Sequence, residues 1–189
     1  MNASARYFSL VFVLFLLPVV AAPAGAVTPQ YELLKAIDNG DSGKVEDLLR
    51  AGVSADTRRR SDGMPAIVIA AQAGRSSIVK ILLDNGANPN AGDRLRGETA
   101  LMLRAVAGDT MLVQLLLAYN ADPNRADIGQ ETALMKAVRG RKFKVAQALI
   151  EAGADPNVQD LTGKTALEYA QISRSRRFIR LLQDAGATY

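Results

Sequence analysis

The fold is decided by a short segment that occurs three times, as Gly86-Ala87-Asn88-Pro89-Asn90, Asn120-Ala121-Asp122-Pro123-Asn124 and Gly153-Ala154-Asp155-Pro156-Asn157. Successive copies are separated by 34 and 33 residues, and an apolar run stands before each one. Eight or nine residues after each copy, the tripeptide Thr-Ala-Leu begins at residues 99, 132 and 165. Self-similarity at a fixed period of this length indicates a repeat architecture, in which stacked units share one continuous core.

Each unit has the pattern of a helix, a turn, a second helix and an extended loop. In the third unit, Thr99 predicts an N-cap and Gly108 a left-handed helix end. A second helix follows over about residues 110–119, and Pro123 prevents its continuation. We therefore predict an all-α solenoid. Its five units, of which the outer two are degenerate, cover approximately residues 30–57, 58–91, 92–125, 126–158 and 159–187.

Residues 1–26 have the pattern of an export signal. Arg6 is the only charged residue within them, an apolar stretch follows it, and Ala24-Gly25-Ala26 fits a cleavage site. The stretch is short for a membrane helix and is interrupted by a proline, so we expect cleavage rather than anchoring. The expected mature domain is 27–189, without an integral membrane segment.

The absence of cysteine gives information about the cell compartment of the protein. The chain has no Cys, and its one Asn-x-Ser/Thr match, at Asn2, lies inside the expected signal. Export without disulfides or glycosylation sites favours a bacterial periplasm or exterior over a eukaryotic secretory route.

The composition argues against catalysis and against nucleic acid. The chain has no Cys and no His, which removes Cys nucleophiles, His general bases and the usual zinc and haem ligands. Aromatic residues make up only 5% of it, which disfavours stacking platforms for bases. We find no nucleophile elbow and no phosphate-binding loop, so we expect no enzyme and no cofactor or metal. The remaining catalytic alternative, carboxylate chemistry, would need paired Asp or Glu in a deep cleft.

The repeated residues resemble the ankyrin repeat, whose pattern is Gly-x-Thr-Pro-Leu-His-x-Ala-Ala, then Gly-His, an apolar run and Gly-Ala-Asp-x-Asn. In the third unit the matching positions are Gly97, Thr99, Leu101, Ala105, Gly108, Leu115 to Leu117, Ala121, Asp122 and Asn124. The pattern's Pro and His are replaced by Ala and by Met or Glu, Arg104 replaces a small residue, and Pro65 replaces the capping Thr. The resemblance covers roughly residues 30–187.

This resemblance implies a non-catalytic scaffold that binds another protein through finger-like loop tips and the concave face of the first helices. Carried onto this chain, the contact residues are Arg59, Arg60, Met64, Arg94, Leu95, Arg96, Glu98, Ile128 and Glu131 in the fingers, with Arg139 on the concave face. The alternative is that the arginines are solvated loop residues with acidic neighbours. We expect a monomer that acts as a helper, inhibitor or immunity-type protein.

A basic cluster near the end of the chain suggests a second class of function. Its members are Arg141, Lys142, Lys144, Arg174, Arg176, Arg177 and Arg180, and no Asp or Glu occurs within 132–150 or 169–183. Such a concentration of charge would hold anionic lipid or polymer at the cell envelope. The plainer interpretation is a solvated polar cap, which the terminal unit of a solenoid requires.

Overall fold

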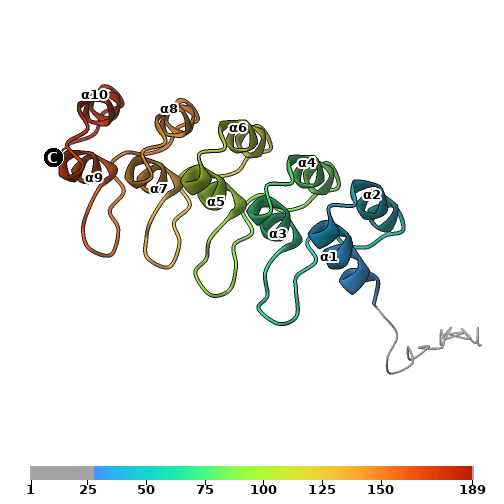
Figure 1. Cartoon of the computed structure of the whole chain (residues 1–189). Coiled ribbons are helices and arrows are strands. Elements are labelled where there is room, and N and C mark those ends of the chain that lie inside the picture. Colours follow the sequence, from blue (N-terminus) through green and yellow to red (C-terminus); the bar gives the residue numbers. More distant parts are fainter. Residues whose placement is uncertain (1–27, 189) are drawn as a thin grey trace, which may run out of the picture.

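The computed structural model describes residues 28–188, and the predicted export signal at 1–26 lies outside the described residues. The described part forms ten helices in five consecutive helix–turn–helix pairs that stack into an elongated array (Figure 1). The helices are α1 Pro29–Asn39, α2 Ser42–Arg50, α3 Ala66–Gln72, α4 Ser76–Asp84, α5 Ala100–Ala107, α6 Thr110–Ala118, α7 Ala133–Arg139, α8 Phe143–Glu151, α9 Ala166–Ile172 and α10 Arg176–Asp184. The predicted all-helical, repeated architecture is confirmed.

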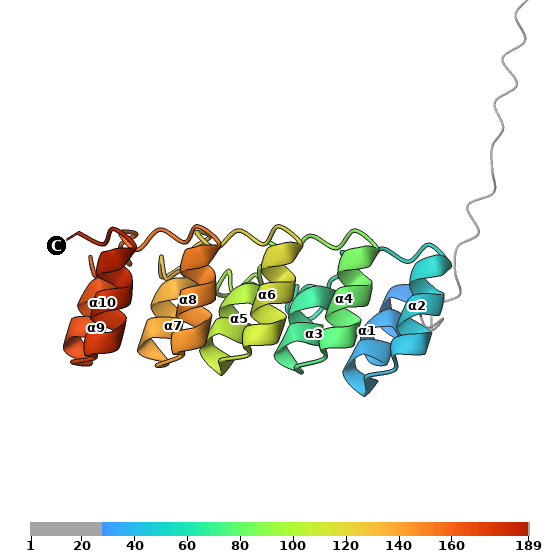
Figure 2. The same cartoon turned by 90° about the horizontal axis from the view of Figure 1, so that it is seen from above.

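The helices lie in two layers. The first helices of the pairs, α1, α3, α5, α7 and α9, contact one another in sequence order, and the second helices run alongside them (Figures 1 and 2). Between successive pairs the chain extends away from both layers as a hairpin-like loop (Figure 1). Because every unit repeats this path, all the loops project from the same side of the array.

The helix starts follow the chemistry predicted from the sequence. The Thr99 hydroxyl accepts the Met102 N–H at 3.3 Å, and Thr132 and Thr165 cap α7 and α9 in the same way. Pro65 stands at the corresponding position of α3, and no side chain caps that helix. Each cap thus satisfies one of the N–H groups that the first turn of a helix leaves without an intrahelical partner.

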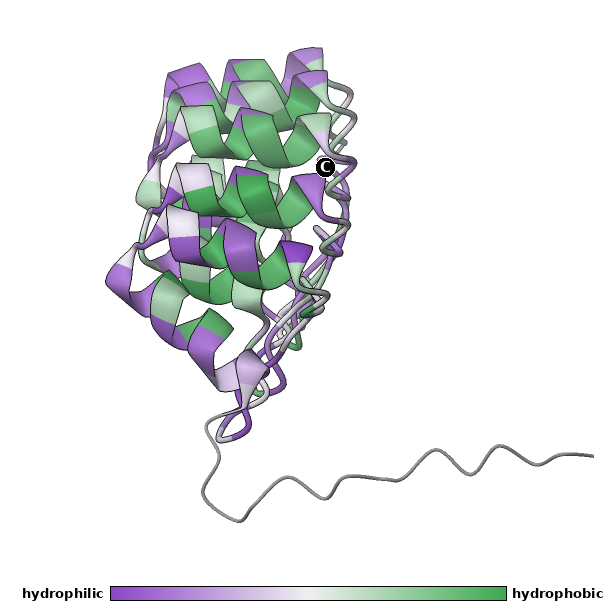
Figure 3. Ribbon diagram, turned by 90° about the vertical axis from the view of Figure 1, so that its right-hand side faces the viewer, coloured by the Kyte–Doolittle hydropathy of each residue, from purple (hydrophilic) through white to green (hydrophobic). Residues whose placement is uncertain are grey.

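One hydrophobic core runs the length of the array. It extends from Leu33 to Leu182 and takes buried side chains from helices of both layers, whose apolar residues are green in Figure 3. Leu116 and Leu149 are completely buried in it. Alanines such as Ala100 and Ala133 are buried where the first helices meet, which lets neighbouring backbones approach closely.

Asparagine side chains join each unit to the next. Asn90 Oδ1 accepts the Asp122 N–H at 2.7 Å, and Asn124 Oδ1 accepts the Asp155 N–H at 2.6 Å. The Asn157 carboxamide bonds the following turn, at Thr188, in the same way. Each of these Asn side chains also donates to a backbone carbonyl of the next unit. The Asn-Pro-Asn segment and the two Asp-Pro-Asn segments therefore do more than end a helix, because they fix the spacing of the stack.

The turn inside each pair contains a left-handed residue. In the first three pairs this residue is glycine, at Gly40, Gly74 and Gly108. In the last two it is arginine, Arg141 with φ 55° and Arg174 with φ 50°. A side chain with a Cβ atom is strained in this conformation. Two of the cluster's arginines are therefore held at positions where glycine would fit better.

Replacing Arg174 by glycine should stabilise the chain. The Arg174 side chain makes no hydrogen bond or ion pair with the described residues, so the main effect is relief of the left-handed backbone. We expect the free energy of unfolding to rise by about 0.5–1 kcal/mol, measured by urea denaturation.

The control is Arg180→Gly within α10. The backbone at Arg180 is helical, so glycine relieves no strain there. This substitution should lower the free energy of unfolding by about 1 kcal/mol. Destabilisation by Arg174→Gly of the same size as the control would contradict the strain argument.

Candidate functional site

Four fingers project from the array between successive pairs. We define finger 1 as residues 58–65, finger 2 as 92–99, finger 3 as 126–132 and finger 4 as 159–165. The first three are closed by isolated antiparallel bridges, and finger 4 by the Asp160 N–H bonded to the Lys164 carbonyl at 3.0 Å. Each finger is therefore an ordered hairpin.

In fingers 2, 3 and 4, an aspartate side chain accepts hydrogen bonds from backbone N–H groups of the same finger. In finger 2, Asp93 accepts the N–H groups of Leu95, Arg96 and Glu98 at 2.7–3.1 Å. The corresponding Asp127 and Asp160 accept backbone N–H groups in fingers 3 and 4. These bonds replace those that the turning backbone cannot make with itself, so the tips hold one shape.

Fingers 2, 3 and 4 are also bonded to each other. The Ile128 N–H donates to the Arg96 carbonyl at 2.8 Å, and the Leu161 N–H donates to the Gly129 carbonyl at 3.1 Å. Each of these three tips carries an apolar side chain that is mostly exposed, 75% for Leu95, 62% for Ile128 and 73% for Leu161. The result is a row of apolar groups on a rigid edge, which we call the tip row.

A buried lysine ties two fingers to the helix layer. Lys136 lies on α7 with only 9% of its side chain exposed, and its Nζ is 2.7 Å from Asp127 Oδ2 and 3.0 Å from Glu98 Oε1. Glu131 lies 3.3 Å from the same nitrogen. Burial alone would lower the pKa of Lys136, but the bonds to Asp127 and Glu98 outweigh it and raise the pKa. Lys136 therefore remains charged at neutral pH.

The network continues into the last pair. Glu131 pairs with Arg139, whose guanidinium lies 5.3 Å from the centre of the Tyr169 ring on α9. The Tyr169 hydroxyl in turn donates to Asp160 in finger 4. Polar contacts thus connect fingers 2, 3 and 4 to α7 and α9, beneath the tip row.

The structure separates the predicted contact residues into two groups. Arg60, Arg94, Leu95, Arg96 and Ile128 are exposed at the fingers. By contrast, Glu98 and Glu131 are half-buried against Lys136, and Arg139 is exposed but paired with Glu131. Arg59 is paired with Asp62 at 2.7 Å, and Met64 packs against the core. Some predicted contacts thus support the fingers from inside.

The seven residues of the predicted basic cluster lie around the turns and second helices of the last two pairs. Arg141 donates to the Ser173 carbonyl at 3.3 Å, and Arg177 lies over the Phe143 ring at 3.5 Å from its centre. None of the seven forms an ion pair with a described residue. We call this surface the basic edge.

Comparison with protein families identifies the repeated unit. The family model for ankyrin repeats, which spans three copies, matches residues 33–127 and again residues 107–189. The chain belongs to the ankyrin repeat family. The comparison with curated proteins gave no match. Ankyrin repeats are general protein–protein interaction modules, and proteins built from them are typically non-catalytic scaffolds.

Two further observations concern membrane-spanning helices and metal sites. Within residues 28–188 no helix combines the length and apolar character needed to cross a membrane. In the same part of the chain, no group of three or more acidic side chains is arranged to hold a metal ion. The carboxylates of Glu98, Asp127 and Glu131 instead surround the Lys136 ammonium group.

Sequence reasoning missed Lys136 and Asp160. One signal was available for Asp160, because Asp93, Asp127 and Asp160 recur at the repeat period at the start of three fingers. For Lys136 no comparable signal exists. Its partner Glu98 is 38 residues away, and a single lysine in a short helix suggests an exposed side chain.

Replacing Lys136 by Met should strongly destabilise the array. Three carboxylates would lose their shared cation, and breaking a buried pair from one side costs about 3–5 kcal/mol. Urea denaturation would measure the loss. Lys44→Met, at an exposed site on α2, is the control and should change the free energy of unfolding by no more than about 0.5 kcal/mol. Equal effects of the two substitutions would refute a structural role for the network.

Asp160 should make the array sensitive to acid. Burial would raise the pKa of Asp160, but hydrogen bonds from Tyr169, Thr162 and two backbone N–H groups lower it well below the ordinary 3.8. A group with a lowered pKa stabilises the fold above its ordinary pKa, and this contribution is lost as pH falls through the folded pKa. The free energy of unfolding should therefore decrease steadily as the pH falls below about 4.

Asp160→Asn should be less stable than the original chain at neutral pH, by about 1–3 kcal/mol, and should show a smaller further loss in acid. Tyr169→Phe removes only one of the donors to Asp160 and should give an intermediate result. Parallel acid profiles for all three proteins, measured by urea denaturation at a series of pH values, would contradict this role of Asp160.

Proposed function

We propose that this chain is a non-catalytic protein-binding scaffold that engages its partner through the tip row and the adjoining concave face. The observation that carries the proposal is the tip row itself: Leu95, Ile128 and Leu161 are exposed on fingers bonded to each other through their backbones. Exposed apolar groups at the surface of a soluble array are typical of contact sites.

The support beneath the tips favours binding. Because Lys136 and the finger aspartates already fix the fingers, little conformational freedom is lost when a partner binds. Exposed Arg94 and Arg96 flank Leu95, which suits a partner surface with an apolar centre and acidic surroundings. On the concave face, Val106 and Ile172 are exposed and extend the apolar surface beyond the tips.

We place this scaffold in an exported compartment, the periplasm or the cell exterior of a bacterium. The sequence pattern of residues 1–26 and the absence of Cys support this location. In such a compartment, a monomeric binding protein without catalytic groups would serve as a helper, an inhibitor or an immunity-type protein for another exported protein.

A second candidate function is favoured by the basic edge. Seven cationic side chains lie together without ion pairs to the described residues, and two of them occupy strained left-handed positions. Arg177, Arg176 and Arg180 also line a hollow of about 490 Å³. This surface would bind anionic lipid or polymer of the cell envelope, with an affinity that falls steeply as salt rises.

Affinity capture separates the two candidates. The chain is used as bait in an extract of its own compartment, and the bound material is washed at low and at high salt. A protein retained at high salt in a fixed ratio supports the scaffold, and its identity then allows direct binding measurements. Recovery of only anionic lipid or polymer, lost as salt rises, supports the basic edge instead.

Arg94→Glu/Arg96→Glu should weaken binding of that partner by roughly tenfold or more, because two cations at the contact become repulsive. The melting temperature should stay nearly unchanged, since both side chains are exposed. The matched control is Lys44→Glu/Lys80→Glu on α2 and α4, which makes the same charge change away from the fingers. Equal affinity of both variants would remove finger 2 from the contact surface.

A further inference from the structure

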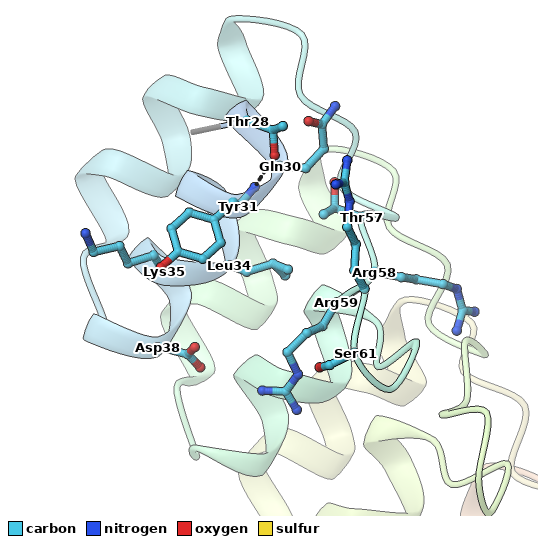
Figure 4. Close-up of a pocket in the computed structure, with 11 residues that line it drawn as sticks. Thr28, Gln30, Tyr31, Leu34, Lys35, Asp38, Thr57, Arg58, Arg59 and Ser61 are labelled. Atoms are coloured by element: carbon cyan, nitrogen blue, oxygen red, sulfur yellow. Dashed lines mark hydrogen bonds between the residues drawn. The ribbon is translucent and has the colours of Figure 1, made fainter. Parts of the chain in front are cut away.

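A hollow lies at the first pair of the described chain, between α1 and finger 1. It has a volume of about 710 Å³. Tyr31, Leu34, Lys35 and Asp38 reach it from α1, and Arg59 and Ser61 lie across from them on finger 1 (Figure 4). We call this hollow the end groove. Its position is the flank of finger 1 that faces away from finger 2.

The repeat register locates a free backbone donor on that flank. Ile128 and Leu161 follow the finger aspartates, and their N–H groups donate back to the preceding finger. Arg60 is the corresponding residue of finger 1, because Arg59 pairs with Met64 across the hairpin as Asp127 pairs with Glu131. Within residues 28–188 the Arg60 N–H has no acceptor, and neither has the N–H of Arg94, the corresponding residue of finger 2, so finger 1 is not bonded into the row. Arg60 lines the end groove, and its free N–H is therefore available to a ligand there.

The side chains around the groove indicate what would fill it. Tyr31 is 56% exposed and Leu34 lies beside it, which gives an apolar floor. Lys35 and Arg60 are exposed and form no ion pair with a described residue. Their neighbours are already engaged: Arg59 holds Asp62, and Arg58 donates to the carbonyls of Gly63 and Gly92. The free charges of the groove are therefore mainly positive.

We propose that the end groove binds an extended segment of the partner protein, with acidic residues beside an apolar one. The segment would supply a backbone carbonyl to the Arg60 N–H, an apolar side chain to Tyr31 and Leu34, and carboxylates to Lys35 and Arg60. This is edge-strand addition, in which backbone bonds give affinity and side-chain contacts give selectivity.

One charge limits the sequence of this segment. Asp38 lines the same groove, and its carboxylate repels a segment that is acidic along its whole length. The groove therefore suits one or two acidic residues near an apolar side chain, not a uniform polyanion. The inference rests on the proposed scaffold function, because it names the part of the partner that one site takes.

Random peptides displayed on phage, selected on the full chain, test the proposal. We expect enriched sequences with acidic residues next to an apolar one. Their binding should fall by roughly tenfold or more in Lys35→Glu/Arg60→Glu, since two attractive charges become repulsive. The Lys44→Glu/Lys80→Glu control should bind as the original chain does. Hydrogen exchange supplies a second readout: the Arg60 amide should exchange rapidly in the free chain and become protected in the complex.

The outcomes separate this inference from the scaffold itself. Peptides that lose affinity in Arg94→Glu/Arg96→Glu but not in Lys35→Glu/Arg60→Glu would overturn the end groove and leave the tip row as the binding site. A selection without enrichment would also overturn the end groove, while the capture experiment still decides the scaffold. A protected Arg60 amide in the free chain would show that the N–H is already bonded without a partner, which overturns binding of a partner segment there.

Discussion

Burial between neighbouring units is the constraint on which this molecule depends. A single helix pair exposes apolar side chains on both flanks, and only the next pair covers them, so the core from Leu33 to Leu182 exists only in the stack. Asn90, Asn124 and Asn157 hold consecutive units in register by bonding the backbone of the following turn. The fingers inherit their spacing from this stack, which is why loops can form an ordered edge.

The polar network under the fingers adds specificity to that stack. Burying Lys136 with three carboxylates contributes little net stability, because desolvation of the charges offsets their attraction. The Lys136 network, however, joins Glu98 of finger 2 to finger 3 and α7. Any shift of one unit along another would break this network. The contacts that fix the tips are therefore the same contacts that penalise a misaligned stack.

The features predicted from the sequence are those that depend on residues close together in the chain. The caps at Thr99, Thr132 and Thr165, the missing cap at Pro65 and the left-handed Gly108 were all confirmed, because each depends on neighbouring residues. Lys136 was missed because its partners come from separate fingers. The end groove was missed for a similar reason: Arg60 is one of several loop arginines in the sequence, and only the structure shows that its N–H has no acceptor among residues 28–188.

The finger-to-finger hydrogen bonds all run in one direction, since finger 3 donates to finger 2 and finger 4 donates to finger 3. This row of fingers 2, 3 and 4 is therefore polar: finger 2 accepts at the Arg96 carbonyl, and finger 4 presents, by the same register, the Thr162 carbonyl at the far end. A two-fold axis through that end would place acceptor against acceptor, so a symmetric dimer gains no such bond there. Continuation of the row by the same kind of hydrogen bond is therefore head-to-tail, and the direction of the edge disfavours symmetric pairing through finger 4.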